Sequence, residues 1–343
     1  CFVTFFPQLI AGPIVLHSEF LPQLTARENR RPDAEKVYRG LALFTLGLSK
    51  KVLLADTLAQ LVNAEYDAIA YLDVPSAWVT IIFYMLELYF DFSGYTDMAR
   101  GIGLLFGFTL PENFNSPLMS DSVKDFWRRW HMTLSRFFGS YVYIPLGGNR
   151  RGKAIQCRNL LIVFLLSGLW HGAGWTFLVW GLMHGLCAVF ETLLPPLRTE
   201  SWKPASVKLL TAFRKIRTFL LVTLSFSVFR AASLQDAALL WKKLFLGGWN
   251  GMLLGISGTI AMPETFVIQK LIAMKAPGLA VPFCMAVMIG LLVLSILLIA
   301  GPRAEDWLEK KGHKVSSALL LAVLFLWSFT SLSQVSTFLY FDF

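Results

Sequence analysis

Long apolar segments alternate along the chain with shorter segments rich in lysine, arginine, proline and glycine. An apolar run of about 20 residues is long enough to cross a bilayer as a helix, so this pattern predicts several membrane spans. The expected spans are residues 76–92, 156–170, 174–194, 216–230, 279–301 and 315–333. Residues 1–16 are apolar but are broken by two prolines and a glycine, which is typical of a re-entrant segment.

Two further segments before residue 110 have a helical pattern that is not a plain span. Residues 38–62 carry Lys50 and Lys51 in their middle, where a span would be apolar. Residues 94–109 predict a short glycine-rich helix that begins near Tyr95 and follows the span at 76–92.

Residues 121–141 have the pattern of an amphipathic helix that lies flat at a membrane surface. At about 100° per residue, one side carries the large apolar residues Phe126, Trp130, Leu134, Phe137 and Tyr141. Charged residues occupy the opposite side, which makes the segment too polar to span. His131 falls at the edge of the apolar side, so we expect it to point into protein. Residues 234–246 likewise predict an interfacial helix.

The composition supports a polytopic membrane protein. Of the 343 residues, 55% are hydrophobic and only 15% are charged, against roughly 25% charged in soluble domains. This excludes a disordered chain, a soluble two-domain enzyme and a disulfide scaffold. The net charge of +9 is explained by cytoplasmic loops at 198–217 and 302–314 under the positive-inside rule, and we expect no nucleic acid partner. The C-terminus, residues 338–343, is then expected outside the cell membrane.

His171 is the clearest candidate for chemistry. It lies between two expected spans and among glycines that allow close backbone approach. Ionisable groups at membrane depth are costly, and a neutral imidazole can take a proton from a hydroxyl group. The alternative is a structural histidine that is hydrogen-bonded inside a helix bundle.

His131 and Asp91 are weaker candidates from the residues alone. His131 could equally be a packed interfacial histidine. Asp91 and Asp97 could line a polar tunnel or orient a histidine, or could be a buried pair that caps the helix expected from Tyr95. We expect no metal site, because His171 and His184 are 13 residues apart, or about 220° around a helix, and no Cys/His cluster is present.

The glycine-rich segment 147–154 nearly matches a phosphate-binding loop, but Ala154 stands where Ser or Thr would bind magnesium. No strand pattern precedes it, so we reject nucleotide hydrolysis; a topological role is favoured over phosphate binding. No acyl-enzyme nucleophile motif is present, so any acyl transfer is expected to be direct, within a ternary complex.

Several motifs together resemble the membrane-bound O-acyltransferase (MBOAT) family, and within it the AlgI-like branch of alginate O-acetyltransferases. The motifs that carry the resemblance lie at residues 5–7, 11–13, 89–98, 111–115, 126–131, 143–150, 169–174 and 338–343. Family members carry further N-terminal spans, so we expect residues 1–343 to form a single MBOAT domain that lacks its first spans.

The resemblance implies an all-α ring of transmembrane helices, with re-entrant and interfacial helices around a central tunnel. It implies that His171 is catalytic and that His131 is the second signature histidine. Residues expected to line the tunnel or to position substrate are Asp91, Trp130, Trp170 and Asn115. No cofactor is expected to be bound, and the donor is acetyl-CoA or another acyl thioester from the cytoplasm. The acceptor is expected to be an exported, alginate-like polysaccharide, reached directly or through a periplasmic acetyltransferase or export partner at the inner membrane.

Two alternatives remain from the sequence. The same fold could transfer D-alanine to teichoic acid or acetyl to peptidoglycan. A proton-coupled transporter is disfavoured, because such folds often contain internal repeats and none is visible here.

Overall fold

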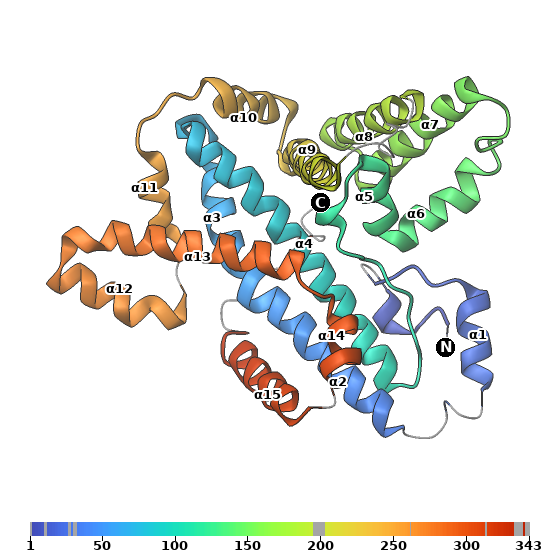
Figure 1. Cartoon of the computed structure of the whole chain (residues 1–343), viewed down its shortest axis with the longest axis horizontal. Helices are drawn as coiled ribbons and strands as arrows, with labels where there is room; N and C mark the ends of the chain where they lie inside the picture. The colour runs from blue at the N-terminus through green and yellow to red at the C-terminus, as the bar shows by residue number, and fades with distance from the viewer. Residues whose placement is uncertain are drawn as a thin grey trace. The chain divides into compact units, whose positions relative to one another are not determined.

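The computed structural model describes residues 2–9, 12–26, 29, 33–194, 203–260, 262–312, 314–332 and 339. Within these ranges every regular element is a helix and no strand occurs, as the sequence predicts. The described part of the chain divides into two compact units, one formed by residues up to 112 together with those from 239 onward, and one formed by residues 113–238. Figure 1 labels the longer helices of each unit.

Three of the described helices are long and apolar enough to cross a membrane. They are α7 (Lys153–His171), α8 (Trp175–Leu193) and α13 (Ala280–Ala300) with the turn that precedes it. These helices match the spans expected at 156–170, 174–194 and 279–301. The span expected at 315–333 is the shorter apolar helix α15 (Val315–Thr330). The span expected at 216–230 forms the second half of α9 (Pro204–Arg230).

The first unit is organised around α4 (Val74–Leu105), a continuous helix of 32 residues. Asp73 caps its start, since the Asp73 carboxylate accepts from the Ser76 N–H at 3.0 Å. Because α4 continues without a break to Leu105, the expectation that a second helix begins near Tyr95 is wrong. Gly94 instead lies where α4 packs on α2 (Ala34–Ser49), because a Cβ on Gly94 would come within 2.7 Å of the Gly47 carbonyl oxygen. Figure 1 shows these two helices side by side.

A π-helical segment, Lys50–Ala55, joins α2 to α3 (Asp56–Asp67). It explains the two lysines that interrupt the apolar pattern of residues 38–62. The Lys50 ammonium lies 2.6 Å from the Asp97 carboxylate, and the Lys51 ammonium lies 2.6 Å from Asp91 and 2.7 Å from Asp56. The buried lysines are thus paired with carboxylates, as a low-dielectric interior requires.

Shorter helices complete this unit. They are η1 (Phe6–Gln8), α1 (His17–Thr25), η4 (Ile69–Tyr71), α11 (Met252–Ile256), η7 (Ser257–Thr259), α12 (Pro263–Lys275), η8 (Pro277–Leu279) and α14 (Ala304–Lys311). The helix expected at 234–246 is present as α10 (Leu234–Leu246), and the boundary between the two units falls within it.

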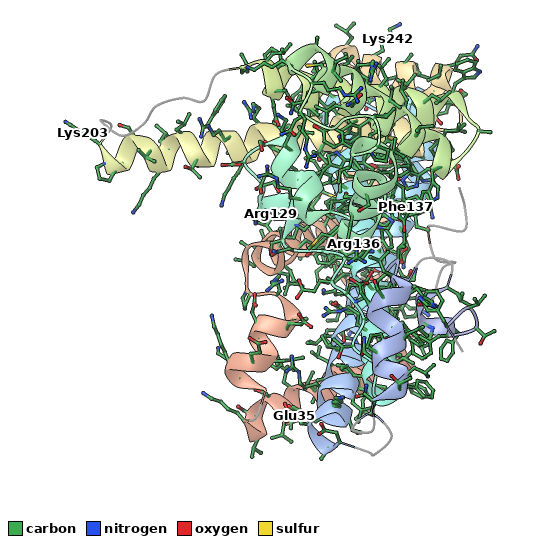
Figure 2. All side chains as sticks on the ribbon, turned by 90° about the vertical axis from the view of Figure 1, so that its right-hand side faces the viewer. Glu35, Arg129, Arg136, Phe137, Lys203 and Lys242 are labelled. Carbon is green, nitrogen blue, oxygen red and sulfur yellow. The ribbon has the colours of Figure 1, made fainter. Side chains whose placement is uncertain are left out.

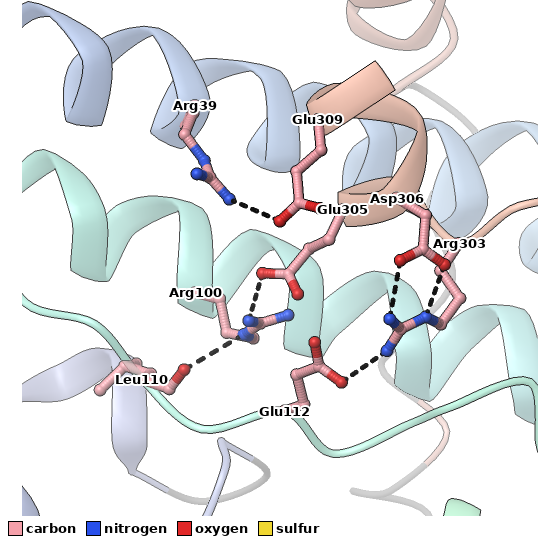
Figure 3. A network of polar contacts seen from close by, with 8 residues as sticks. All are labelled: Arg39, Arg100, Leu110, Glu112, Arg303, Glu305, Asp306 and Glu309. Carbon is pink, nitrogen blue, oxygen red and sulfur yellow. Dashed lines mark hydrogen bonds and ion pairs between the residues drawn. The ribbon is translucent and has the colours of Figure 1, made fainter. Parts of the chain in front are cut away.

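A polar network holds the extended segment that leads out of the first unit (Figure 3). The Arg100 guanidinium donates to the Leu110 carbonyl oxygen at 3.3 Å and pairs with Glu305. The Arg303 guanidinium lies 2.7 Å from Glu112 and also makes a two-pronged contact with Asp306. Residues 110–112 are therefore fixed just before Asn113.

The carboxyl groups of Glu112 and Glu305 share a hydrogen bond in this network. Burial, and then Glu305, raise the pKa of Glu112 from 4.5 to about 7. Burial alone would raise the pKa of Glu305, but the hydrogen bond from Glu112 and the charge of Arg100 lower it. Below about pH 7 the pair therefore holds a proton that belongs mainly to Glu112.

We expect Glu112→Gln to weaken the pH dependence of stability. The contribution of protonated Glu112 is complete below pH 4.5 and is lost as the pH rises through about 7. In that window the unfolding free energy of the wild type should fall as the pH rises, with a slope that corresponds to up to about one proton. The variant should lack this part of the slope. Thermal unfolding in detergent across this pH range measures the effect. Glu309→Gln is the matched control, because Glu309 makes only an exposed 3.9 Å pair with Arg39; equal slopes in both variants would contradict the prediction.

The second unit contains α5 (Val123–Arg129), α6 (Met132–Phe138), α7, α8 and α9, with the short segments η5 (Pro117–Met119) and η6 (Gly139–Tyr143). The single amphipathic helix expected over 121–141 is wrong, because the chain breaks between α5 and α6 at Trp130 and His131. All buried residues of α9 lie in its second half, from Thr218 onward. Figure 2 shows the first half of α9 extending away to Lys203.

Candidate active site

His171 is the last residue of α7, and its ring lies among aromatic rings from three helices. The ring centroid is 5.0 Å from that of Trp170 on the same helix, 5.3 Å from Trp180 on α8 and 5.2 Å from Phe229 on α9. The imidazole is half-buried in this setting. The helix end thus presents a titratable ring to an apolar environment.

Glycines allow α7 and α8 to approach closely enough to build this setting. A Cβ on Gly168 would lie 2.4 Å from the Phe177 carbonyl oxygen, and a Cβ on Gly181 would lie 2.4 Å from the Phe164 carbonyl oxygen. No side chain fits at such distances, so only glycine permits this packing. The close contact holds His171 beside Trp180.

His131 lies in the break between α5 and α6, in the left-handed backbone region with φ 44° and ψ 52°. Residues other than glycine adopt this conformation rarely, and such positions concentrate at functional sites. The side chain is only 3% exposed, which confirms that His131 points into protein. A straight helix would have placed its ring differently, so the break determines where the imidazole lies.

Asn113 is a side-chain partner of His131. Its Oδ1 lies 3.2 Å from His131 Nδ1 and also accepts hydrogen bonds from the Thr133 N–H at 3.1 Å and the Thr133 hydroxyl at 2.9 Å. The Met132 N–H donates to the Asn113 carbonyl oxygen at 3.0 Å. The sequence did not single out Asn113, because only tertiary contact joins residue 113 to residues 131–133.

The two histidines share a neighbour. The Trp170 ring lies 6.2 Å from the His131 ring and 5.0 Å from the His171 ring, measured between centroids. Burial, and then the proximity of His171, lower the pKa of His131 well below its usual range. His131 is therefore neutral at pH 7, and one of its ring nitrogens carries a lone pair.

Both ring nitrogens of His184 have structural partners. The Trp127 indole N–H donates to His184 Nδ1 at 3.1 Å. His184 Nε2 lies 2.7 Å from the Ser225 hydroxyl, which itself donates to the Val222 carbonyl oxygen. The ring is 2% exposed. His184 therefore acts as a structural link between α5, α8 and α9.

The other residues that the sequence singled out fall in different places. Trp130 stacks on Phe126 at 5.3 Å and packs against Phe226 at 5.5 Å, within the aromatic core of the second unit. The Asn115 N–H donates to the Arg129 carbonyl oxygen at 2.9 Å. Asp91 belongs to the first unit, where it pairs with Lys51 and accepts from the Leu339 N–H at 3.0 Å. Apart from Leu339, the closing aromatic tail lies outside the described residues, as does Ala11 of the first motif.

The glycine-rich segment forms a turn before α7. Gly147, Gly148 and Gly152 all have positive φ, and the preceding described element is the π-helical segment Gly139–Tyr143. The Asn159 amide donates to the Gly148 carbonyl oxygen at 3.0 Å and fastens the turn to α7. Among the described residues, no group of three potential ligands that could hold a metal ion occurs.

Comparison with known proteins decides the family. The model of the membrane-bound O-acyltransferase family matches residues 1–232. The chain belongs to this MBOAT family. Family membership and the apolar helices together indicate a multi-pass membrane protein, in agreement with the all-helical fold.

Curated MBOAT relatives act on several polymers of the cell envelope. The chain is 41% identical to the peptidoglycan O-acetyltransferase of Helicobacter pylori, over all of this chain and 63% of the relative. It is 41% identical to the probable alginate O-acetylase AlgI of Pseudomonas aeruginosa, over 73% of this chain and 46% of the relative. The teichoic acid D-alanyltransferase of Bacillus subtilis is 27% identical over 66% of this chain and 60% of its own length. The chain thus spans about half to two thirds of the length of these relatives.

Proposed function

We propose that this MBOAT protein transfers an acetyl group from a cytoplasmic thioester to hydroxyl groups of an exported glycan. Acetyl-CoA or another acyl thioester is the donor substrate, and no cofactor takes part. The observation that carries the proposal is the position of His171, which ends an apolar helix among aromatic rings with His131 beside the same Trp170 ring. A histidine in that setting suits proton transfer between substrates that meet inside the protein.

The reaction balances with the two substrates and one histidine. His171 takes the proton of the acceptor hydroxyl as the oxygen attacks the thioester carbonyl carbon. The resulting tetrahedral intermediate breaks its C–S bond, and the proton on His171 passes to the leaving thiolate. The products are an O-acetyl ester and a free thiol. His131 assists by holding or relaying a proton near the same substrates. Trp170, Trp130, Asn115 and Asp91 stay candidates for lining the substrate path.

Two acceptors have specific support. An alginate-like exopolysaccharide is supported by 41% identity to AlgI over 250 residues. Peptidoglycan is the second candidate, because the relative named for that polymer matches all of this chain at the same identity. D-alanyl transfer has weaker support, since those relatives are 27% and 29% identical.

Mass spectrometry of surface glycans from strains with and without the gene tests this proposal. We expect loss of ester-linked acetate from exopolysaccharide or from peptidoglycan in the deletion strain, with restoration by the full-length gene. Loss of ester-linked alanine from teichoic acid with unchanged acetate would contradict acetyl transfer. Unchanged esters on all three polymers would contradict acyl transfer to a surface glycan.

We further propose an inner-membrane location with the basic segments on the cytoplasmic side. Lys310, Lys311 and Lys314 flank α15, and such lysines face the cytoplasm under the positive-inside rule. The C-terminus would then be periplasmic, and a periplasmic acetyltransferase or export protein could receive the acetyl group. The donor would enter from the cytoplasm and the acceptor from the opposite side.

A further inference from the structure

We propose that Asn113 is a positioning residue that fixes the tautomer of His131, so that Nδ1 carries the ring proton and Nε2 carries the lone pair. The role of that lone pair in proton transfer rests on the proposed function, whereas the tautomer can be measured without any assay of activity. Asn113 and His131 both lie in the second unit, so the inference uses contacts within one compact part of the chain.

The orientation of the Asn113 amide follows from the partners of its Oδ1. The Thr133 backbone N–H lies 3.1 Å from this atom, and a backbone N–H can only donate. The amide NH₂ group cannot accept, so the oxygen must occupy this position. The Thr133 hydroxyl, 2.9 Å away, supplies a second hydrogen bond to the same oxygen.

The tautomer of His131 follows from that orientation. His131 Nδ1 lies 3.2 Å from Asn113 Oδ1, which has no proton to give, so Nδ1 must be the donor. A neutral imidazole has one ring proton, which places the lone pair on Nε2. The buried ring is neutral for the reason given above. Nε2 is therefore the atom of His131 that can accept a proton.

Backbone contacts hold Asn113 against the break between α5 and α6 from both sides. The Met132 N–H donates to the Asn113 carbonyl oxygen at 3.0 Å, and the Asn115 N–H donates to the Arg129 carbonyl oxygen at 2.9 Å. Left-handed conformations of residues other than glycine persist where surrounding contacts over-determine them. Residues 113–115 supply such contacts on either side of His131.

The burial of the Asn113 side chain is not explained by stability alone. It is 1% exposed, and its Nδ2 has no hydrogen-bond partner among the residues that the structure describes. A buried donor left without an acceptor opposes folding, and such groups call for an explanation other than packing. The orientation of His131 through Oδ1 supplies one.

The test is nuclear magnetic resonance of the full-length protein with ¹⁵N-labelled histidine. The His131 signals are assigned by their loss in His131→Gln. We expect Nδ1–H in the wild type, a shift of at least about threefold in the tautomer ratio toward Nε2–H in Asn113→Leu, and restoration of Nδ1–H in Asn113→Asp, whose carboxylate accepts the same hydrogen bonds. Asn115→Leu is the matched control for the tautomer, because the hydrogen bond of Asn115 to the Arg129 carbonyl oxygen uses its backbone N–H.

Activity measurements separate this inference from the proposed function. We expect kcat in Asn113→Leu to fall about 10- to 100-fold with a smaller change in KM for the donor, and Asn113→Asp to recover part of the loss. An unchanged Nδ1–H tautomer in Asn113→Leu would overturn the inference. The wild-type tautomer with full activity in His131→Gln would instead overturn the proposed role of His131 and leave the inference about Asn113 intact.

Discussion

Replacement of His171 by alanine in the full-length protein is expected to lower ester-linked acetate on the exported glycan by about 10²- to 10⁴-fold. The ring lies at the end of α7 among the rings of Trp170, Trp180 and Phe229, none of which is a base that could take over the proton. Water is a poor substitute in such a setting, because a positioned base contributes through geometry as well as basicity. Mass spectrometry of the glycan, with the membrane level of the protein measured in parallel, checks the expectation.

The matched control is His17→Ala. His17 is an exposed residue of α1, and its ring lies against the ring of Phe2. We expect the control strain to keep its acetate. Normal acetylation by the His171→Ala strain, or an equal loss in both strains, would contradict the assignment of His171.

Replacement of His184 by alanine is expected to affect stability far more than chemistry. His184 accepts from Trp127 and is hydrogen-bonded to Ser225, so its loss leaves a half-buried indole N–H without this partner and opens a cavity between α5, α8 and α9. Large-to-small changes at buried sites cost about 2–5 kcal/mol of unfolding free energy. Unfolding of the purified protein in detergent, followed by tryptophan fluorescence, measures the loss.

The two variants His171→Ala and His184→Ala are expected to have opposite effects on activity and on stability. We expect His171→Ala to keep a midpoint of unfolding close to that of the wild type and to lose acyl transfer. His184→Ala should show the reverse, with a lower midpoint and substantial activity per folded molecule at low temperature. A stable but inactive His184→Ala protein would show that His184 belongs to the chemistry.

The apolar pattern predicted the bounds of the spans well where those bounds do not depend on tertiary packing. The helices α7, α8 and α13 begin and end within three residues of the expected bounds. The pattern failed at Ser93 and Gly94, which resemble the start of a helix but lie inside α4. There Gly94 packs against Gly47 of α2, and a contact of that kind leaves no trace in local sequence.

The break at His131 could not be predicted from the apolar periodicity either. The apolar residues Phe126, Trp130, Leu134 and Phe137 keep a helical spacing across it, because one left-handed residue changes the direction of the chain without changing the order of apolar side chains. Burial of His131 was predictable from its place at the edge of the apolar side. Its partner was not, since the motif at 111–115 contains two asparagines and only tertiary contact distinguishes Asn113 from Asn115.

The chemistry of Asp91 shows a further limit of the sequence. Two carboxylates in an apolar segment suggested a tunnel or a helix cap. The partners that decide between these roles, Lys51 and Leu339, lie 40 residues before and 248 residues after Asp91. The lysines themselves were visible as interruptions in an apolar pattern, so a charge-pairing rule for buried lysines would have predicted carboxylate partners but not which ones.

Transfer of a labelled acetyl group by the purified full-length protein tests the central claim most directly. The protein is reconstituted in vesicles with an isotopically labelled acetyl thioester and a glycan acceptor, and the label is followed into alkali-labile esters. We expect wild-type protein to place the label on acceptor hydroxyls without forming a labelled protein, and His171→Ala to place none above the rate without enzyme. Equal transfer by His171→Ala, or label held covalently by the protein, would contradict direct transfer assisted by His171.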